Sequence, residues 1–298
     1  MKIGILSVLY NQNLTEGNTW KTLLLPASEK AGKTEVVLAD NSDDPQIREE
    51  NRRAAEACGA VYLDMQGNRG LPAAYNWAID RILSETDSIP ETETDSQAEE
   101  AEWIVIADQD TCFPADYLQV LERTAAQTDG DVLVPAVKAG QKLLSPCRRK
   151  GSRFVPCESD APGKEALQEA FFINTGLAFR KEVFADPEIR YDEQLFLDFV
   201  DFDLLCRLRT RARTKICFAQ LPGVVLQQQF SGTEKRTAEQ NLERFRHFVQ
   251  DGRTFYERWY GRGMAERAVR SRALRLAVKH RDIRFFQFLK NRHVCDRV

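Results

Sequence analysis

Two aspartates separated by one residue follow an apolar segment in the middle of the chain. Asp108 and Asp110 come directly after Trp103–Ala107, which is apolar throughout and is expected to be a buried strand. In open α/β sheets ligands gather where strands end, and neighbouring carboxylates repel each other unless a cation lies beside them. Oxygen ligands of this kind hold Mg²⁺ or Mn²⁺ next to a diphosphate. The alternative is an Asx turn that caps a helix expected from Pro114.

A second acidic group lies among large apolar side chains. Asp198, Asp201 and Asp203 alternate with phenylalanine, leucine and valine, where an unpaired carboxylate is costly to bury. Arg207 and Arg209 offer purely structural ion pairs, which is the alternative interpretation. The three aspartates cannot all face one side of a helix, so we expect at least one to point into a cleft. A carboxylate in such a place is a candidate general base.

Several other chemistries lack the residues that they require. The three histidines stand at positions 247, 280 and 293, whereas a catalytic triad or a zinc hydrolase needs one near the strand ends. The chain has neither G-x-G-x-x-G nor a Walker loop, and its seven cysteines include no C-x-x-C pair. A formal net charge of −3 excludes a globally basic nucleic-acid binder.

Strands and helices are expected to alternate along the first part of the chain. Expected strands are residues 3–10, 35–39, 60–64, 103–107 and 131–135, and expected helices are 19–28, 45–58, 71–83 and one from Pro114. The strands are apolar almost throughout, which predicts an α/β fold with a mostly parallel sheet covered by helices on both sides.

The second half of the chain is expected to complete this sheet and then become helical. Residues 138–168 are predicted to be irregular, 170–180 a strand, 195–211 helical from near Val200, and 215–219 and 224–229 the closing strands. We therefore expect a catalytic domain over residues 1–232 and a helical extension over 233–298.

Charge is distributed unevenly between a central segment and the C-terminal segment. Residues 84–102 hold eight carboxylates and no basic residue, which predicts an exposed acidic loop. From Arg258 onward there are twelve Lys or Arg against three Asp or Glu, interleaved with leucine and phenylalanine. Such a segment is expected to lie on an anionic membrane surface, or alternatively to pack its phenylalanine face on the catalytic domain or a second subunit.

The rest of the sequence favours a cytoplasmic protein. No secretory signal and no transmembrane segment are recognisable, and unpatterned cysteines are typical of a reducing compartment. We therefore expect a cytoplasmic location, with peripheral contact at the inner face of the membrane as an option.

Six short motifs occur in one order along residues 1–232. They are S-V-L-Y-N at 7–11, A-D-N-S at 39–42, G-N-R-G-L-P-A-A-Y-N at 67–76, D-Q-D-T at 108–111, N-T-G at 174–176 and F-L-D-F-V-D-F-D at 196–203. Together they resemble family 2 glycosyltransferases of the GT-A (Rossmann-like) fold. The pattern is most similar to bacterial rhamnosyltransferase- and galactofuranosyltransferase-like members.

This resemblance implies a role for each matching residue. The nucleotide-sugar pocket would be lined by Tyr10, Asn11, Asp40, Asn68, Gly70, Asn76 and Asp108, with Asp40 on the base. Asp108 and Asp110 would hold Mn²⁺ or Mg²⁺, with Gln229 standing where related sequences often have a histidine ligand. Asp201 would be the catalytic base, with Asp198 and Asp203 orienting it or the acceptor. Thr175 and Gly176 would lie near the acceptor.

The resemblance also implies a reaction. An inverting enzyme would move a sugar from dTDP-rhamnose or a UDP-sugar to a glycan or lipid-linked acceptor, in the synthesis of a cell-surface polysaccharide such as O-antigen or capsule. No nucleic-acid partner is expected. Two alternatives are a nucleotidyltransferase on the same sheet, although residues 7–18 hold no lysine for a phosphate loop, and an inactive protein that binds nucleotide sugars or membranes.

Overall fold

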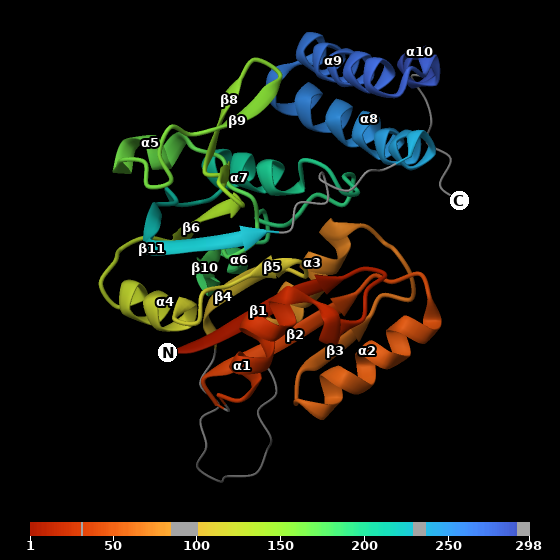
Figure 1. The fold of residues 1–298 in the computed structure, drawn as a ribbon. Helices are drawn as coiled ribbons and strands as arrows, with labels where there is room; N and C mark the ends of the chain where they lie inside the picture. The colour runs from red at the N-terminus through yellow and green to blue at the C-terminus, as the bar shows by residue number, and fades with distance from the viewer. Residues whose placement is uncertain (31, 85–100, 229–236, 291–298) are drawn as a thin grey trace.

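The computed structural model describes residues 1–30, 32–84, 101–228 and 237–290 (Figure 1). These residues form a nine-stranded sheet in the order β3-β2-β1-β4-β10-β6-β11-β5, with β7 beside β6, and a separate β8–β9 pair. The strands are β1 (Lys2–Leu9), β2 (Thr34–Asp40), β3 (Val61–Asp64), β4 (Ala101–Asp108), β5 (Thr111–Cys112), β6 (Val132–Ala139), β7 (Lys142–Ser145), β8 (Cys147–Lys150), β9 (Arg153–Pro156), β10 (Ala178–Arg180) and β11 (Phe218–Gln228).

Helices cover both faces of this sheet. They are α1 (Leu25–Ser28), preceded by a π-helical turn over Trp20–Leu24, α2 (Pro45–Ala57), α3 (Leu71–Ser84), α4 (Tyr117–Ala125), α5 (Lys164–Glu169), α6 (Lys181–Ala185), α7 (Val200–Thr210), α8 (Ala238–Tyr260), α9 (Arg262–His280) and α10 (Gln287–Lys290). Buried side chains of α3, α6 and α7 form the core on one face, and those of α1, α2 and α4 the core on the other. The expected α/β fold is confirmed.

The sheet is mixed because β10, β5 and β7 each pair antiparallel with their neighbours. β1, β2, β3 and β4 pair in parallel, as the strand–helix alternation predicted. β10 pairs antiparallel with both β4 and β6, whereas β11 runs parallel to β6. Most of the sheet is therefore parallel, and β10 joins the parallel strands β3, β2, β1 and β4 to the parallel pair of β6 and β11.

Three predictions about the second half of the chain were wrong. The segment expected as one strand over 170–180 forms a strand only at β10, because Gly176 adopts φ +78° and the chain turns there. Residues 138–168 are not irregular but contain β7, β8, β9 and α5. The two closing strands are one long strand, β11, whose register shifts between Gln220 and Val225 around a Pro-Gly pair.

Smaller differences concern helix boundaries. The helix expected from Pro114 begins at Tyr117. The C-terminal region is helical as predicted, and α8 begins with a capping box between Thr237 and Gln240. The acidic loop lies almost wholly in residues 85–100, and the expected domain boundary at 232 lies in 229–236, so both fall outside the described residues.

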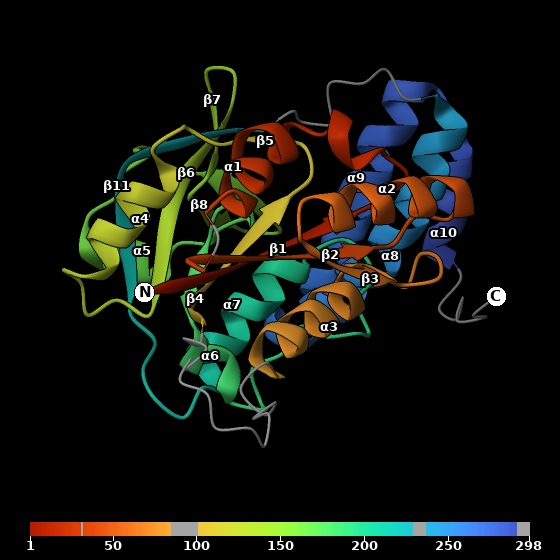
Figure 2. The same cartoon turned by 90° about the horizontal axis from the view of Figure 1, so that it is seen from below.

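The C-terminal helices pack on the sheet domain and on each other. Phe255 and Tyr256 of α8 belong to the same core as α3, α6 and α7. Phe245 and Phe248 of α8 meet Phe285, which follows α9, in a second cluster. Figure 2 shows α8, α9 and α10 together at the end of the molecule toward which β1 runs. None of the described helices is sufficiently long and apolar to span a membrane.

Candidate active site

The end of β4 carries the two aspartates separated by one residue. The Asp108 carboxylate accepts hydrogen bonds from the Tyr75 hydroxyl at 3.2 Å and from the Gln228 amide at 3.0 Å. Asp110 Oδ1 lies 3.4 Å from the same Gln228 nitrogen. Gln228 reaches both because β5, just after the aspartates, pairs antiparallel with the end of β11. Strand pairing, not sequence proximity, therefore assembles this group.

Among the described residues, the side-chain partners of these two carboxylates are the neutral groups of Tyr75 and Gln228. Burial, with Asp201 and Asp110 nearby, raises the pKa of Asp108 to about 8. Burial also raises the pKa of Asp110. A raised pKa means that the ionised form lacks compensation, and a divalent cation would supply it. The residues present therefore fit a metal held by Asp108 and Asp110.

The protein itself supplies few ligands for a metal ion. Among the described residues no group of three or more His, Cys, Asp or Glu side chains is arranged to hold a metal ion. Mg²⁺ and Mn²⁺ are commonly held by one or two carboxylates, with waters and substrate phosphates completing the shell. Gln229, the expected third ligand, lies outside the described residues, and Gln228 stands beside the aspartates.

Buried hydroxyls support the turn that carries the aspartates. The Thr175 hydroxyl accepts the backbone N–H of Asp108 at 3.1 Å and lies 2.9 Å from the Thr111 hydroxyl. The Gly176 N–H donates to the Ile106 carbonyl at 2.7 Å. A Cβ at Gly176 would lie 2.3 Å from the Leu226 side chain, so only glycine fits. Thr175 and Gly176, expected near the acceptor, are placed under this turn and are buried.

Asp201 lies in the first turn of α7, close to Asp108. Its Oδ2 accepts the Asn174 backbone N–H at 3.3 Å, and burial raises its pKa to about 6. The preceding Phe199 adopts φ +63°, which turns the chain sharply into the helix.

The other two aspartates of this segment form ion pairs. Both oxygens of Asp198 contact the Arg244 guanidinium, one of them at 2.8 Å. Asp203 is fully buried and accepts from Arg207 at 2.6 Å, Arg258 at 2.9 Å and Trp259 at 2.7 Å. Within the described part of the chain, Asp201 is the member of the three without a basic partner.

Polar groups at the ends of β1 and β2 form the other part of the site. Asp43 accepts from the Tyr10 hydroxyl at 3.0 Å, the Asn11 amide at 3.4 Å and the Asn68 backbone N–H at 3.3 Å. Tyr10 is 44% exposed, and Gln109 holds its backbone through two hydrogen bonds of 2.8 and 3.2 Å. This group is open to solvent.

Asp40 lies beneath this group and is fully buried. Its carboxylate accepts from the Asn51 amide at 2.8 Å, the Tyr62 hydroxyl at 2.9 Å and the Ser42 backbone N–H at 2.9 Å. The structure thus places Asp40 inside the loop that presents Asp43.

Two further expected residues shape the entrance to α3. Gly70 adopts φ +85°, and a Cβ there would lie 3.1 Å from the Phe196 carbonyl oxygen. Asn76 exchanges hydrogen bonds with the Tyr191 backbone at 3.0 and 2.9 Å and so holds the segment before α7. Both join α3 to that segment.

A pocket of about 720 Å³ opens over these strand ends, a size suited to a nucleotide-sized ligand. On the sheet side and on α3 it is lined by Val8, Tyr10, Asn68, Leu71, Tyr75, Asp108, Gln109, Asp110 and Gln228. The opposite wall is Phe196 and Leu197 together with Gln240, Glu243, Arg244 and His247 of α8. The His247 ring stacks on Phe196, with centroids 4.6 Å apart.

The α8 wall was not predicted from the sequence. Its residues carry no motif, and the helix is far from the aspartates along the chain. Gln228 was not singled out from the sequence, and the adjacent Gln229, which was expected as a ligand, lies outside the described residues. Asp43 follows the A-D-N-S motif at once, so its acidic side chain at a strand end was the available signal.

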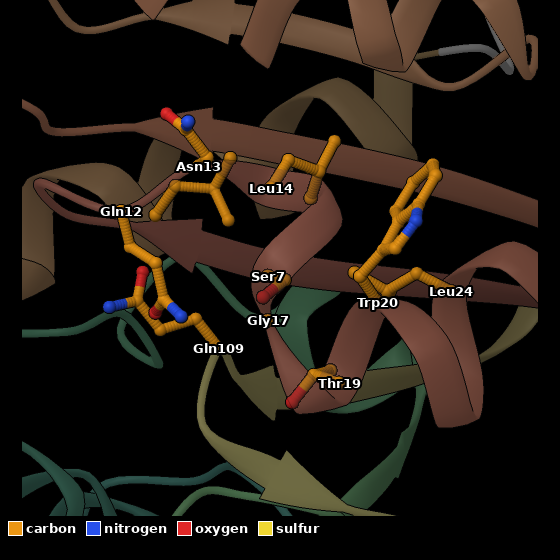
Figure 3. A pocket seen from close by; sticks show the side chains of 10 residues that line it. Ser7, Gln12, Asn13, Leu14, Gly17, Thr19, Trp20, Leu24 and Gln109 are labelled. Atoms are coloured by element: carbon orange, nitrogen blue, oxygen red, sulfur yellow. The ribbon is translucent and has the colours of Figure 1, made fainter. Parts of the chain in front are cut away.

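A second, much smaller cavity lies behind the loop after β1 (Figure 3). Its volume is about 10 Å³, which suffices for a single water molecule. The Ser7 hydroxyl, buried and without a hydrogen-bond partner among the described residues, borders it. A cavity of this size cannot hold a nucleotide or a sugar.

Comparison with solved structures identifies relatives of the fold. S. aureus TarS 1–349 is 14% identical, with a TM-score of 0.50 over 97% of this chain and 90% of that chain. The mannosyltransferase PcManGT from Pyrobaculum calidifontis, in complex with GDP-Man and Mn²⁺, is 17% identical, with a TM-score of 0.50 over 97% and 84%. TarS 1–349 in complex with UDP-GlcNAc is 13% identical, with a TM-score of 0.49 over 94% and 73%. For the two structures with a TM-score of 0.50, the likeness at these identities concerns the fold alone.

The sequence itself gives the family. No curated protein sequence matches the chain significantly. The profile described as glycosyl transferase family 2 matches residues 6–186, which is more than half of the chain and includes the second half of β1, all of β2, and Asp108 and Asp110 at the end of β4. The chain therefore belongs to glycosyl transferase family 2 and is a glycosyltransferase with the GT-A fold.

Proposed function

We propose that this enzyme transfers a sugar from a nucleotide-diphosphate donor to an acceptor hydroxyl in one displacement that inverts the anomeric carbon. Asp201 carries the proposal, because it is a carboxylate without a basic partner among the described residues and lies next to Asp108 at the strand ends. The acceptor oxygen bonds to the anomeric carbon as its proton passes to Asp201. The bond from that carbon to the diphosphate oxygen breaks, and the nucleoside diphosphate leaves.

Other residues in and around the pocket bind and orient the two substrates. Tyr10, Asn11 and Asp43 offer donors and an acceptor for the nucleotide base, and Asp40 fixes the loop that presents Asp43. Asp108 and Asp110 would hold a divalent cation, which when bound stabilises the charge of the leaving diphosphate. Mn²⁺ and a nucleotide sugar in the PcManGT complex support this choice of ligands.

The finer assignments follow from the sequence resemblance. We propose dTDP-rhamnose or a UDP-sugar as the donor, a glycan or lipid-linked acceptor, and a role in building a bacterial cell-surface polysaccharide from the cytoplasmic side. Family membership sets aside the nucleotidyltransferase and inactive-protein alternatives.

The proposal is tested by donor binding and by transfer. The protein is mixed with UDP-, dTDP- and GDP-sugars in the presence of Mn²⁺, Mg²⁺ or EDTA, and thermal stability is measured. We expect one nucleotide class to raise the Tm, and the divalent cation to increase that rise. A folded protein whose Tm responds to no nucleotide would contradict the proposed donor site.

A further inference from the structure

Exposed large apolar side chains are concentrated near the C-terminal end of α9. Leu274, Val278, Ile283 and Phe286 are 55%, 71%, 78% and 37% exposed. On the rest of the described chain the exposed large apolar side chains are Tyr10, Leu25 and Trp77, which lie far apart in sequence. Apolar side chains gathered in this way mark an interaction surface, whereas scattered ones need no explanation.

α9 carries apolar side chains on two of its faces. Val269, Ala273 and Ala277 are buried against α8. Arg267, Arg270, Leu274 and Val278 recur at three- and four-residue spacing, so they share one face, and all four are exposed. We call these four residues the outer face of α9. Leu274 and Val278 are not needed to hold α8 and α9 together, because other side chains of these two helices already form a core between them.

The surroundings of the outer face are strongly basic. Arg275, Lys279 and Arg281 are exposed beside it. The acidic residue of α9 is Glu266, which is already engaged with Arg253 and Arg270. Leu274 and Val278 therefore lie among exposed arginine and lysine side chains.

We propose that the outer face of α9 binds the surface of an anionic lipid membrane. Arginines attract lipid phosphates, and the aliphatic side chains between them enter the boundary of the acyl chains. A nucleic acid would use the arginines but gains nothing from Leu274 and Val278. A second copy of the same face would bring like charges together, which disfavours self-association.

The location of this face suits a lipid-linked acceptor, a point that rests on the proposed function. His280, at the end of α9, lies 3.1 Å from Asn241 of α8, and Arg284 pairs with Glu239 of α8 at 3.0 Å. The neighbouring Gln240 and Glu243 line the pocket. Both α9 and α8 therefore lie between the outer face and the pocket, a separation of about two helix diameters, or roughly 20 Å.

Vesicle co-sedimentation of the full chain, without donor or acceptor, tests the proposal independently of catalysis. The vesicles contain phosphatidylcholine alone or with phosphatidylglycerol. We expect binding to the anionic vesicles only. Two double variants separate the contributions of charge and of apolar surface. Arg267→Gln with Arg270→Gln should bind anionic vesicles about 25-fold more weakly, at roughly fivefold per arginine. Leu274→Ser with Val278→Ser should bind them about tenfold more weakly, or less tightly still.

A matched control carries the same kinds of change far from the outer face. Leu25→Ser with Arg53→Gln alters α1 and α2, which lie at the opposite end of the molecule from α9 (Figure 1), and should bind as the wild type does. Circular dichroism confirms that each variant is folded. The proposal is overturned if the wild type ignores anionic vesicles, or if the leucine–valine variant binds as tightly as the wild type. Conversion of a wild-type dimer to a monomer by that variant would also overturn it, in favour of self-association.

Discussion

Asp201 differs from its two acidic neighbours in what surrounds it. Asp198 and Asp203 are neutralised by arginines, whereas Asp201 receives one backbone N–H and is half-buried near Asp108. An ion-paired carboxylate is a weak base because its partner stabilises the charged form. The difference in partners, more than position along the chain, makes Asp201 the candidate base.

Replacing Asp201 by asparagine removes the proton acceptor and keeps the side-chain shape. We expect kcat to fall by about 10²- to 10⁴-fold, the usual contribution of a general base. Donor affinity, measured by calorimetry, should change little, because the amide can still accept the Asn174 N–H. A variant with wild-type kcat would show that another group takes the proton.

The pH dependence of the rate follows from the same residue. Burial raises the pKa of Asp201 to about 6, and a base acts only when deprotonated. The rate should therefore rise with pH, about tenfold per unit below pH 6, and level off above pH 7. Steady-state rates between pH 4.5 and 8 measure this, and a flat profile below pH 6 would exclude Asp201 as the base.

The exposed Asp43 and the buried Asp40 allow the base-binding group to be tested by a matched pair of variants. Asp43→Asn should weaken donor binding about tenfold, by loss of a charged acceptor, with little effect on Tm. Asp40→Asn should destabilise folding by about 1–3 kcal/mol, because Asn51, Tyr62 and Ser42 all donate to that carboxylate. Calorimetry measures donor binding and thermal melts measure stability. If Asp40→Asn weakened donor binding and Asp43→Asn lowered the Tm, Asp40 would be the residue that contacts the nucleotide base.

At the scale of elements, α8 holds the segment that leads into α7. Asp251 of α8 is fully buried and accepts the backbone N–H groups of Phe196, Leu197 and Asp198 at 2.9, 2.8 and 2.7 Å. Burial raises the pKa of Asp251 to about 6, so it is ionised at neutral pH. One side chain thereby fixes three consecutive residues, two of which line the pocket.

Asp251→Asn should loosen this segment, because an amide has one acceptor oxygen for three donors. We expect a loss of about 1–3 kcal/mol in the free energy of unfolding and a larger KM for the donor. Glu257→Gln, an exposed change on the same helix, serves as the control and should alter neither quantity. Denaturant melts and steady-state kinetics provide the two measurements, and an unchanged KM would mean that Asp251 acts on stability alone.

The sequence predicted the parallel half of the fold better than the antiparallel half. Apolar runs followed by Asp40 or Asp108 identified β2 and β4, since buried parallel strands carry continuous apolar segments. The run Ala170–Ile173 has the same composition, but its place is set by long-range contacts, including a bridge between Phe171 and Cys147. Periodicity cannot distinguish these cases.

The site was predictable only where its residues lie at strand ends or in motifs. Asp108, Asp110 and Asn68 meet that condition, and the structure places all three on one pocket. Gln228 and Arg244 do not meet it. Gln228 is more than a hundred residues from Asp108 along the chain and reaches it because β11 pairs with β5. Arg244 reaches the site because α8 packs there, and it pairs with Asp198. Pairing of distant segments leaves no local pattern.

For the whole molecule, the C-terminal helices complete the catalytic domain and are not an appendage. Arg258 and Trp259 of α8 supply two of the donors to the buried Asp203, and Arg258 also pairs with Asp192. We therefore expect that a chain ending at Gln228 shows no cooperative unfolding transition. Removing one partner of a buried ion pair typically costs about 3–5 kcal/mol.

A single substitution tests the same contact in the full chain. Arg258→Ala should lower the Tm strongly, whereas Arg262→Ala, at an exposed position at the start of α9, should not. Scanning calorimetry compares the two. Equal stability of both variants, together with a folded truncated chain, would make the helices an independent unit.

Because α8 contacts the pocket on one side and α9 on the other, it joins two binding events thermodynamically. If the donor binds more tightly when α8 is held in place, then occupation of the outer face of α9 changes donor affinity by some factor. Linkage requires the donor to change the affinity of that face by the same factor. Vesicles should then act as an effector of the enzyme, detectable as an altered KM, and the donor as an effector of adsorption.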